Sequence, residues 1–422
     1  MKVKTALTSL ALILIYTSVV FAQSGSSLGI GGNTAISRGV DAVYWNPANL
    51  AFEHKDYPKF QMILYSFTAG GGNNSFSFNT FNDYIGDGES IYLTEDDKNS
   101  ILDEIDDDGL KFDASMGFSA LSFRYKNFGV GIEGRVYGNV KIPKAIYRNL
   151  LFKIGHETYD YSVDGEGVGV GKLKFSYGRT IVRDKKLELP FGKSIYLKEI
   201  SAGLSFSYLT GLGFGEVEEG TAKIDINDNG ILADVETRAK YALMGSGIGI
   251  DLGFGAITND GWNFGLVIEN LVGSINWDDE TELTSARLDV EDRKFAIGAG
   301  QWEDAGDDGF VDTTYAIPAF SKSLPTNFRI GIAKELSKKF LVNFEFANEN
   351  KNFFTSVGGR FKLGILHLFF SLKNGMGNIH WNTAFALDLK NFIFDIGVSS
   401  RSSFSFAGSK GFFVGSTMRI GF

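Results

Sequence analysis

Hydrophobic and polar residues alternate with a period of two along most of the chain. In segment 339–348, for example, Phe340, Val342 and Phe344 fall on one face, whereas Asn343 and Glu345 fall on the other. Such alternation, repeated in segments of about ten residues, is the pattern of β-strands whose two faces meet different surroundings. We predict fourteen strands, at 59–68, 114–125, 128–140, 168–182, 199–209, 240–257, 262–275, 326–335, 339–348, 353–361, 365–373, 379–389, 391–399 and 411–422.

The composition of the two faces distinguishes between β folds. In segment 262–275, Trp262, Phe264 and Leu266 oppose Asn263 and Gly265. A water-soluble sandwich also alternates, but its outer faces need no excess of Gly. A transmembrane barrel turns its apolar face to lipid and its polar face to a crowded lumen. The pattern therefore favours an all-β, transmembrane antiparallel β-barrel over a soluble sandwich or barrel.

The predicted connections alternate between short and long. Those at 126–127, 336–338 and 390 are short. In bacterial outer-membrane barrels, short turns face the periplasm and long loops face the exterior. An even strand number satisfies this rule, although merging or splitting one hairpin would give twelve or sixteen strands. The long connections are 69–113, 141–167, 210–239 and 276–325, and 183–198 is a longer connection on the short side.

The two ends of the chain carry export and assembly signals. Lys2 and Lys4 precede an apolar run that ends at a candidate cleavage site after Ala22, which predicts a signal peptide at 1–22. No later run is apolar for the ~18 residues of a spanning helix, so we exclude a helical membrane protein. The terminal Phe422 resembles the signal read by the outer-membrane barrel assembly machinery, although an ordinary edge strand ending in Phe is the alternative. We expect the protein in the cell outer membrane.

Composition and charge exclude several functions. The chain has 52 Gly and 38 Phe among 422 residues, no Cys, and a formal net charge of −9. The acidic balance argues against nucleic acid as a partner. Without Cys there is no thiolate chemistry, and we find neither a Ser-His-Asp arrangement nor a paired-carboxylate site. We therefore expect no catalytic residues and no enzyme activity.

Segment 23–58 is too polar and Gly-rich to span lipid. Pro47 disfavours helix at Asn46, so a helical turn from Asp41 should stop at Trp45. The run Trp45-Asn46-Pro47-Ala48-Asn49-Leu50-Ala51, after a Gly-rich start, resembles the N-terminal hatch of FadL-type outer-membrane proteins, which PorV-like barrels share. The resemblance implies a fourteen-stranded barrel at 59–422 with long extracellular loops, whose lumen is occluded by a hatch at 23–58 that includes Trp45, Asn46, Pro47 and Ala48.

The resemblance leaves two functions open. The FadL branch implies passive transport of hydrophobic or amphipathic small molecules, whereas PorV-like relatives imply a surface or secretion-associated barrel that binds secreted proteins and transports nothing. Segment 324–331 is more similar to the PorV-like type. A transporter should have an apolar cavity running from the loops to the hatch, and a lateral opening or a kink near Asn46-Pro47. The expected partners are outer-membrane lipid, the assembly machinery, and either a hydrophobic ligand or a secreted protein.

One segment matches a metal-binding pattern. Residues 225–236 place Asp225, Asn227, Asn229, Gly230 and Glu236 at the positions of an EF-hand calcium loop. An EF-hand needs flanking helices, but the flanking residues here have a strand pattern and Asn229-Gly230 favours a hairpin turn. The segment is either a Ca²⁺ loop or an acidic hairpin tip, and we expect no other cofactor.

The polar strand faces carry charges of both signs. Because an unpaired buried charge is costly, mixed charge in a lumen favours a salt-bridge network, with a substrate path as the other interpretation. The predicted lumen charges are Arg124, Glu133, Arg135, Asp251, Glu269, Arg329, Glu345 and Asp388, together with Lys172, Lys174, Asp395 and Arg419.

Overall fold

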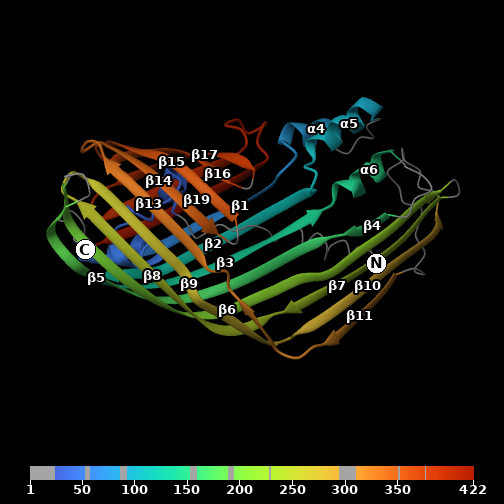
Figure 1. Cartoon of the computed structure of the whole chain (residues 1–422), viewed down its shortest axis with the longest axis horizontal. Coiled ribbons are helices and arrows are strands. Elements are labelled where there is room, and N and C mark those ends of the chain that lie inside the picture. Colours follow the sequence, from blue (N-terminus) through green and yellow to red (C-terminus); the bar gives the residue numbers. More distant parts are fainter. Residues whose placement is uncertain are drawn as a thin grey trace.

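Fourteen strands of the described chain close into one antiparallel barrel (Figure 1). The computed structural model describes residues 24–52, 58–85, 93–152, 159–188, 194–227, 230–293, 310–349, 352–375 and 377–422. The first and last barrel strands pair with each other and so complete the ring. In order around the ring, the strands are β1 (Phe60–Asn73), β2 (Leu110–Tyr125), β3 (Phe128–Ile142), β5 (Asp164–Glu188), β6 (Ser194–Asn227), β8 (Met244–Thr258), β9 (Trp262–Asp279), β13 (Asn327–Glu335), β14 (Phe340–Glu349), β15 (Asn352–Leu363), β16 (Leu366–Gly375), β17 (Asn378–Asp388), β18 (Phe392–Arg401) and β19 (Gly411–Gly421).

The outer face of the barrel is apolar, as the alternation predicts. On β14, Phe344 is 41% exposed, whereas its neighbour Glu345 is 4% exposed. On β16, Phe370 faces outward and Ser371 is fully buried. Large apolar side chains exposed around a closed barrel are the pattern of a surface in contact with lipid. The prediction of a transmembrane β-barrel is confirmed. Among the described helices, none combines the length and the apolarity needed to cross a bilayer.

The barrel wall is much taller on one side than on the other. Strands β5 and β6 have 25 and 34 residues, whereas β13 and β14 have 9 and 10. The outer part of β6 continues beyond the ring as a sheet, at the right of Figure 1. Its other strands are β4 (Tyr159–Ser162), β7 (Gly230–Ala242), β10 (Glu282–Arg293) and β11 (Phe310–Ala316), while β12 (Phe320–Ser323) pairs with β9.

This extension corrects part of the sequence prediction. Connections 210–239 and 276–325, expected as loops, contain strands, and the strand expected at 240–257 is divided at Leu243 between β7 and β8. The extension carries charged residues where the barrel strands carry aromatic ones, so the apolar face that signals a membrane strand is missing. Backbone pairing does not need that face, and the strands form without it.

The two ends of the barrel differ. At one end, here called the loop end, lie the long connections with α4 (Phe78–Ile85), α5 (Glu95–Glu104) and α6 (Lys144–Phe152). At the other end, the turn end, short connections such as 126–127 and 336–339 join the strands. Helix α5 begins with a capping box in which Thr94 and Asp97 bond each other's backbone, and its buried Leu102 packs against Leu110.

Residues 24–52, here called the plug segment, lie inside the ring (Figure 1). They form α2 (Gly25–Ile30), η1 (Gly39–Asp41), α3 (Ala42–Trp45) and η2 (Pro47–Ala51). Helix α2 contacts β15 to β19, and η2 contacts β5, β6 and β8, so the segment reaches opposite walls. Helix α3 ends at Trp45 and Asn46 is extended, as the following Pro47 predicts. The predicted signal peptide at 1–22 lies outside the described residues and stays a prediction.

Candidate functional site: the plugged lumen

Glycines on the inner face of the wall allow the plug backbone to touch the strands. A Cβ added at Gly178 would lie 2.5 Å from the Pro47 oxygen, and one at Gly331 would lie 2.7 Å from the Ala35 nitrogen. Both distances are shorter than atoms tolerate, so only glycine fits. We call the inner-face glycines that leave no room for a Cβ beside the plug the glycine collar. Six of them face the plug backbone and four, Gly129, Gly131, Gly253 and Gly255, face its side chains; the first six are Gly178, Gly203, Gly265, Gly331, Gly358 and Gly397.

Wall side chains form hydrogen bonds with polar groups of the plug that its short helices leave unpaired. Glu345 on β14 accepts hydrogen bonds from the Thr34 nitrogen and hydroxyl, both at 3.0 Å. Asp395 on β18 accepts one from the Ser26 nitrogen at 3.0 Å. Asn343 donates to the Gly32 oxygen at 3.2 Å. Because buried backbone groups are costly when unpaired, these bonds fix the plug in one position.

The turn of the plug motif is held by the side chain of Asn46.

 Asn46 donates to the Phe254 oxygen on β8 at 2.9 Å and accepts from the Ala48 nitrogen at 3.0 Å. Trp45 lies under the guanidinium of Arg329, 5.1 Å from ring centre to carbon, in a cation–π arrangement. Trp45, Asn46, Pro47 and Ala48 are all buried. The structure therefore places the predicted hatch residues together at the contact between plug and wall.

A network of buried charges fills the lumen beside the plug. Glu269 on β9 lies 3.3 Å from Lys172, 3.5 Å from Arg135 and 3.6 Å from Arg329. Arg135 also pairs with Glu133 at 3.0 Å. The neighbouring pair Lys174 and Asp251 is separated by 2.9 Å. Seven of the predicted lumen charges, Glu133, Arg135, Lys172, Lys174, Asp251, Glu269 and Arg329, thus belong to these buried ion pairs. Two others, Asp395 and Arg419, pair with each other, and Arg419 also lies 2.8 Å from Asp41 of the plug.

The other predicted lumen charges lie elsewhere. Glu345 binds the plug, as described above. Arg124 lies at the turn end, where it donates to the Lys126 oxygen at 2.5 Å. Asp388 is half-buried at the same end and accepts from the Lys390 nitrogen at 3.0 Å. Neither Arg124 nor Asp388 joins the network, because both lie at the ends of their strands.

A cavity of about 520 Å³ occupies the lumen on the loop-end side of the plug. Its floor is formed by the plug residues Leu28, Gly31, Gly32 and Trp45. We call it the loop-side cavity. The plug motif and the cavity therefore meet at Trp45, and a molecule entering from the loops would stop on the plug.

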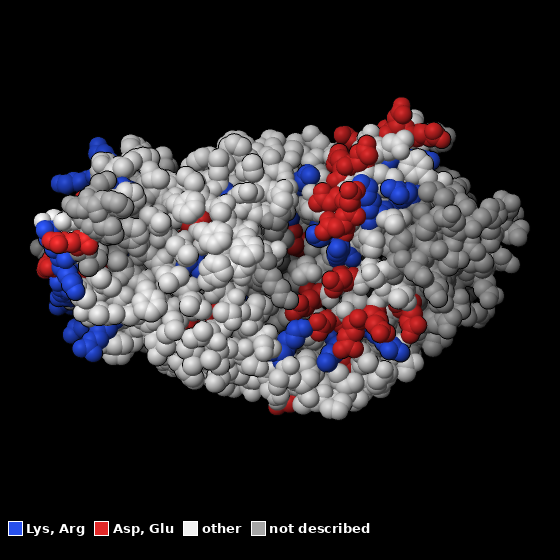
Figure 2. Space-filling model, in the orientation of Figure 1, with Lys and Arg blue, Asp and Glu red and all other residues white. Residues whose placement is uncertain are grey.

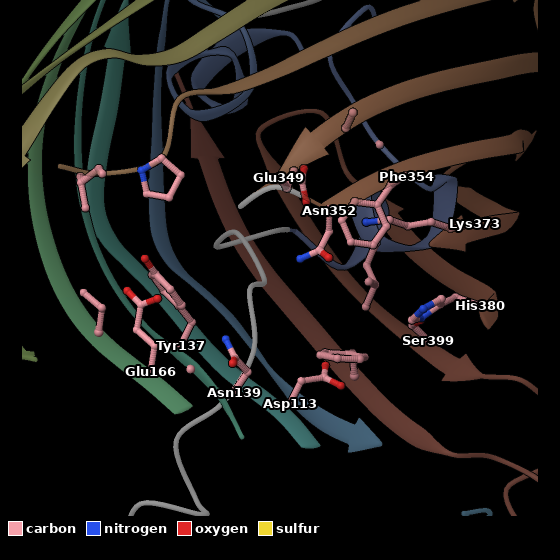
Figure 3. A pocket seen from close by; sticks show the side chains of 18 of the residues that line it. Asp113, Tyr137, Asn139, Glu166, Glu349, Asn352, Phe354, Lys373, His380 and Ser399 are labelled. Atoms are coloured by element: carbon pink, nitrogen blue, oxygen red, sulfur yellow. The ribbon is translucent and has the colours of Figure 1, made fainter. Parts of the chain in front are cut away.

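The walls of the loop-side cavity differ in character. One wall, formed by β3, β5, β6 and β9, is largely apolar and contains a packed cluster that includes Val168, Phe214, Ile275 and Trp277. Tyr137 and Glu166 lie on this side in Figure 3, and Lys373 and His380 lie across from them. The cavity is thus amphipathic and lacks the uniformly apolar lining that the transport hypothesis expects.

Three basic residues form a row across the polar wall. Lys373 on β16 is the register partner of His380 on β17, which in turn is the partner of Arg401 on β18. Arg401 pairs with Asp113 on β2. No described residue forms an ion pair with Lys373, whose nitrogen lies 4.0 Å from the centre of the Phe354 ring. His380 is 7% exposed, and its Nε2 atom has no hydrogen-bond partner among the described residues.

Sequence reasoning did not bring these three residues together. The alternation places Lys373 on the polar face of its strand, but it does not show that strands β16 to β18 align Lys373, His380 and Arg401 at one height. Trp277 was missed because the predicted strand ended at 275, whereas β9 continues to Asp279.

A second cavity of about 500 Å³ lies at the turn end, below the plug. Its lining includes Arg38 of the plug and Arg360, Lys362 and Lys390 of the wall. Arg38 is held by the Ser37 oxygen at 2.8 Å and by Asn263 at 2.7 Å. The plug segment therefore separates two cavities that open toward opposite ends of the barrel.

The possible calcium loop lies on a hairpin. Strands β6 and β7 pair on either side of residues 228–229, with Asp225 opposite Leu232 and Asn227 opposite Gly230. This backbone is that of the acidic hairpin tip and lacks the flanking helices of an EF-hand. Asn229 lies outside the described residues, Glu236 belongs to β7, and Ca²⁺ binding stays a prediction.

The terminal Phe422 lies at the seam of the barrel. Its backbone nitrogen donates to the Phe60 oxygen at 2.9 Å, and the Phe60 nitrogen donates back at 3.3 Å. The side chain is 73% exposed on the outer surface. Its proposed role as an assembly signal stays a prediction.

Comparisons with known proteins identify the family and the fold. A family model described as a family of unknown function (DUF5723) matches residues 51–364. The chain belongs to this family. No curated protein matches the chain at a significant level.

Solved structures with the same architecture align over nearly the whole chain. The toluene transporter TbuX of Ralstonia pickettii aligns with 95% of this chain and 98% of its own, at 11% identity and a TM-score of 0.51. The monoaromatic hydrocarbon channel CymD aligns with 94% and 97%, also at 11% identity and 0.51. A FadL homologue of Pseudomonas aeruginosa aligns with 96% and 99%, at 9% identity and 0.48. At these identities the likeness to TbuX and CymD shows the barrel fold alone. The resemblance to PorV-like barrels stays a prediction.

The glycine collar predicts a selective effect of one added methyl group. A Cβ at Gly203 would lie 2.6 Å from the Pro47 oxygen, whereas Gly213 on the same strand has no atom within 4 Å of that position. We expect Gly203→Ala to lower the free energy of unfolding by about 1 to 3 kcal/mol because the site is overpacked. Gly213→Ala should change it by less than about 0.5 kcal/mol. Urea unfolding in micelles, with hydrogen exchange of residues 45–52, measures both; equal effects would contradict the collar.

The charge network predicts a large effect at its centre. Glu269→Gln keeps the shape of the side chain but leaves Arg135, Lys172 and Arg329 short of one negative charge. We expect the free energy of unfolding to fall by about 3 kcal/mol, as when one partner of a buried pair is lost. The control is Glu219→Gln, which breaks an exposed pair with Arg238 and should cost no more than about 1 kcal/mol. A Glu269→Gln protein as stable as this control would show that the network does not hold the lumen together.

Proposed function

We propose that this protein is a passive outer-membrane transporter of amphipathic small molecules whose polar end is negatively charged. The observation that carries the proposal is the loop-side cavity, which ends on the plug at Trp45 and has one largely apolar wall and one polar wall. The polar wall carries Lys373, His380 and Arg401 beside the carboxylates of Asp113, Glu345 and Glu349. An apolar chain would pack against Phe214 and Trp277. An acidic head group would lie against Lys373 and His380.

Unpaired polar atoms in the cavity support this assignment. The Nε2 atom of His380 and the Nε1 atom of Trp277 are buried without partners among the described residues. Such atoms are costly unless a ligand or water satisfies them. Lys373 and His380 face each other across adjacent strands, so an acidic head group between them would pair with the Lys373 ammonium and lie beside the imidazole.

Transport through this barrel requires the plug to move. The plug separates the two cavities and is held by polar bonds at Thr34, Ser26 and Asn46. Hydrocarbon transporters and channels with this fold support a transport role, since TbuX is described as a toluene transporter and CymD as a monoaromatic hydrocarbon channel. Helix α3 ends at Trp45, and the backbone at Asn46 is extended. The transport hypothesis expects a kink at this place, and the plug would bend there.

One observation favours the alternative function. The sheet of β4, β6, β7, β10 and β11 extends beyond the ring and offers a broad surface at the loop end (Figure 1). A PorV-like barrel that binds a secreted protein would use such a surface and would keep its lumen closed. The transport measurements below distinguish the two functions.

Replacing Lys373 should weaken binding of acidic amphiphiles selectively. Loss of a charge-assisted hydrogen bond predicts a dissociation constant about tenfold higher for Lys373→Gln. The probe is a dansyl-labelled medium-chain carboxylic acid, titrated against the purified protein and followed by its fluorescence. The uncharged alcohol analogue should bind both proteins equally. Equal weakening for both probes would remove the charged subsite from the proposal.

A weakened plug contact tests whether the plug gates transport. Asn46→Ala removes the hydrogen bonds to the Phe254 oxygen and from the Ala48 nitrogen. Loss of about 1.4 kcal/mol of hydrogen bonding that holds the plug should raise the population of the open state, and with it the uptake of the dansyl acid in proteoliposomes, about tenfold.

The variant has a matched control within the wall. The Asn127 side chain donates to the Gly178 oxygen at 3.0 Å, and both residues belong to the wall. Asn127→Ala should transport at the rate of the unmodified protein. Equal uptake by Asn46→Ala and Asn127→Ala would contradict gating by the plug. If the unmodified protein transports no faster than protein-free liposomes, the transport proposal itself is wrong.

A further inference from the structure

The turn end of the barrel is basic although the whole chain is acidic. Exposed Lys and Arg residues gather there, at the left of Figure 2, while the loop end carries most of the acidic residues. Four exposed carboxylates lie at this end as well: Glu188 and Asp260 pair with Lys186 and Lys334, whereas Asp184 and Glu335 form no ion pair with a described residue. We call the exposed cations of this end that form no ion pair with a described residue the basic collar: Lys59, Lys126, Arg179, Lys185, Lys198, Lys338, Lys339 and Lys390.

The loop end has no comparable set among its described lysines. Lys111 and Lys141 both lie near Asp108, at 2.5 and 3.9 Å, and Lys144 lies 3.2 Å from Asp107. Their charge is therefore largely neutralised within the protein, whereas the charge of the basic collar is available to an outside partner.

The basic collar lies at the height of an aromatic belt. Lys126 follows the exposed Tyr125, and its nitrogen lies 5.2 Å from the centre of that ring. Arg179 follows the exposed Tyr177 by two residues on the same outer face. Exposed Tyr and Trp rings mark the interface between membrane and water, where long cationic side chains reach the head groups.

We propose that the basic collar binds the head groups of anionic glycerophospholipids in the membrane leaflet at the turn end. The cations occur next to the start of β1, on β5 and β6, and in the β2–β3, β13–β14 and β17–β18 turns, so they surround the barrel instead of converging on one point. A ring of separated cations suits many lipid molecules, each contacting one or two residues. Each such cation strengthens attachment to an anionic lipid surface roughly fivefold. This proposal is independent of whether the lumen transports anything.

Quenching of Trp262 by brominated lipids measures the binding. Trp262 is 39% exposed at the turn end, and Trp45 and Trp277 are buried in the lumen, away from lipid. Trp302 and Trp381 are replaced by Phe, so that Trp262 is the fluorophore in contact with lipid. The protein is reconstituted in nanodiscs of phosphatidylcholine mixed with phosphatidylglycerol, with bromine on the acyl chains of one lipid at a time. We expect phosphatidylglycerol to be enriched about fivefold or more next to Trp262, and the enrichment to fall as salt is added.

Two variants that each lose four positive charges test whether the enrichment depends on where the charges lie or only on the net charge. Lys126→Gln/Lys338→Gln/Lys339→Gln/Lys390→Gln removes four collar charges and should bring the enrichment close to one. Lys98→Gln/Lys111→Gln/Lys141→Gln/Lys144→Gln removes four charges at the loop end and should leave it unchanged. Both are compared after heat-modifiability on gels has shown that the barrel is folded.

Three results would overturn the proposal. The first is an unmodified protein without enrichment, which would leave the basic end for an acidic protein partner. The second is a collar variant that keeps the enrichment. The third is a loop-end control that loses as much enrichment as the collar variant.

Discussion

The direct contact between the plug backbone and the barrel wall is the constraint on which the rest of the lumen depends. A fourteen-stranded ring leaves an interior that side chains alone would not fill, and this chain fills it with a folded segment of its own. Helix α2 and the η2 turn lie against opposite walls only because the facing residues are glycines. The excess of Gly in the composition therefore reflects space reserved for the plug.

Buried charged side chains fill the part of the lumen that the plug does not reach. Strands β3, β5, β9 and β13 supply cations and carboxylates in close contact, so that each charge is compensated by its neighbours. Compensated charges of this kind hold a fixed geometry, since moving one member leaves the others unpaired. The plug contacts this network through Trp45 and Arg329, so the position of the plug and the arrangement of the charges are linked.

The period-two pattern was sufficient for the barrel because lipid and lumen impose opposite demands on alternate residues. Phe344 and Glu345 could be assigned to their faces from sequence, and so could the helix stop before Pro47. The extension beyond the ring was missed because its strands bear no lipid-facing side. The basic row at Lys373, His380 and Arg401 was missed for another reason: alignment across strands depends on register, which a single sequence does not specify.

Closure of the ring joins the two ends of the barrel sequence. The seam is formed by β1 and β19, and Phe422 itself bonds Phe60. Because β1 is also the first strand after the plug segment, the strand that follows the plug is the one with which β19 pairs. The plug contacts β5, β6 and β8 as well as β15 to β19, so it bridges the early and late strands that the seam joins at the wall.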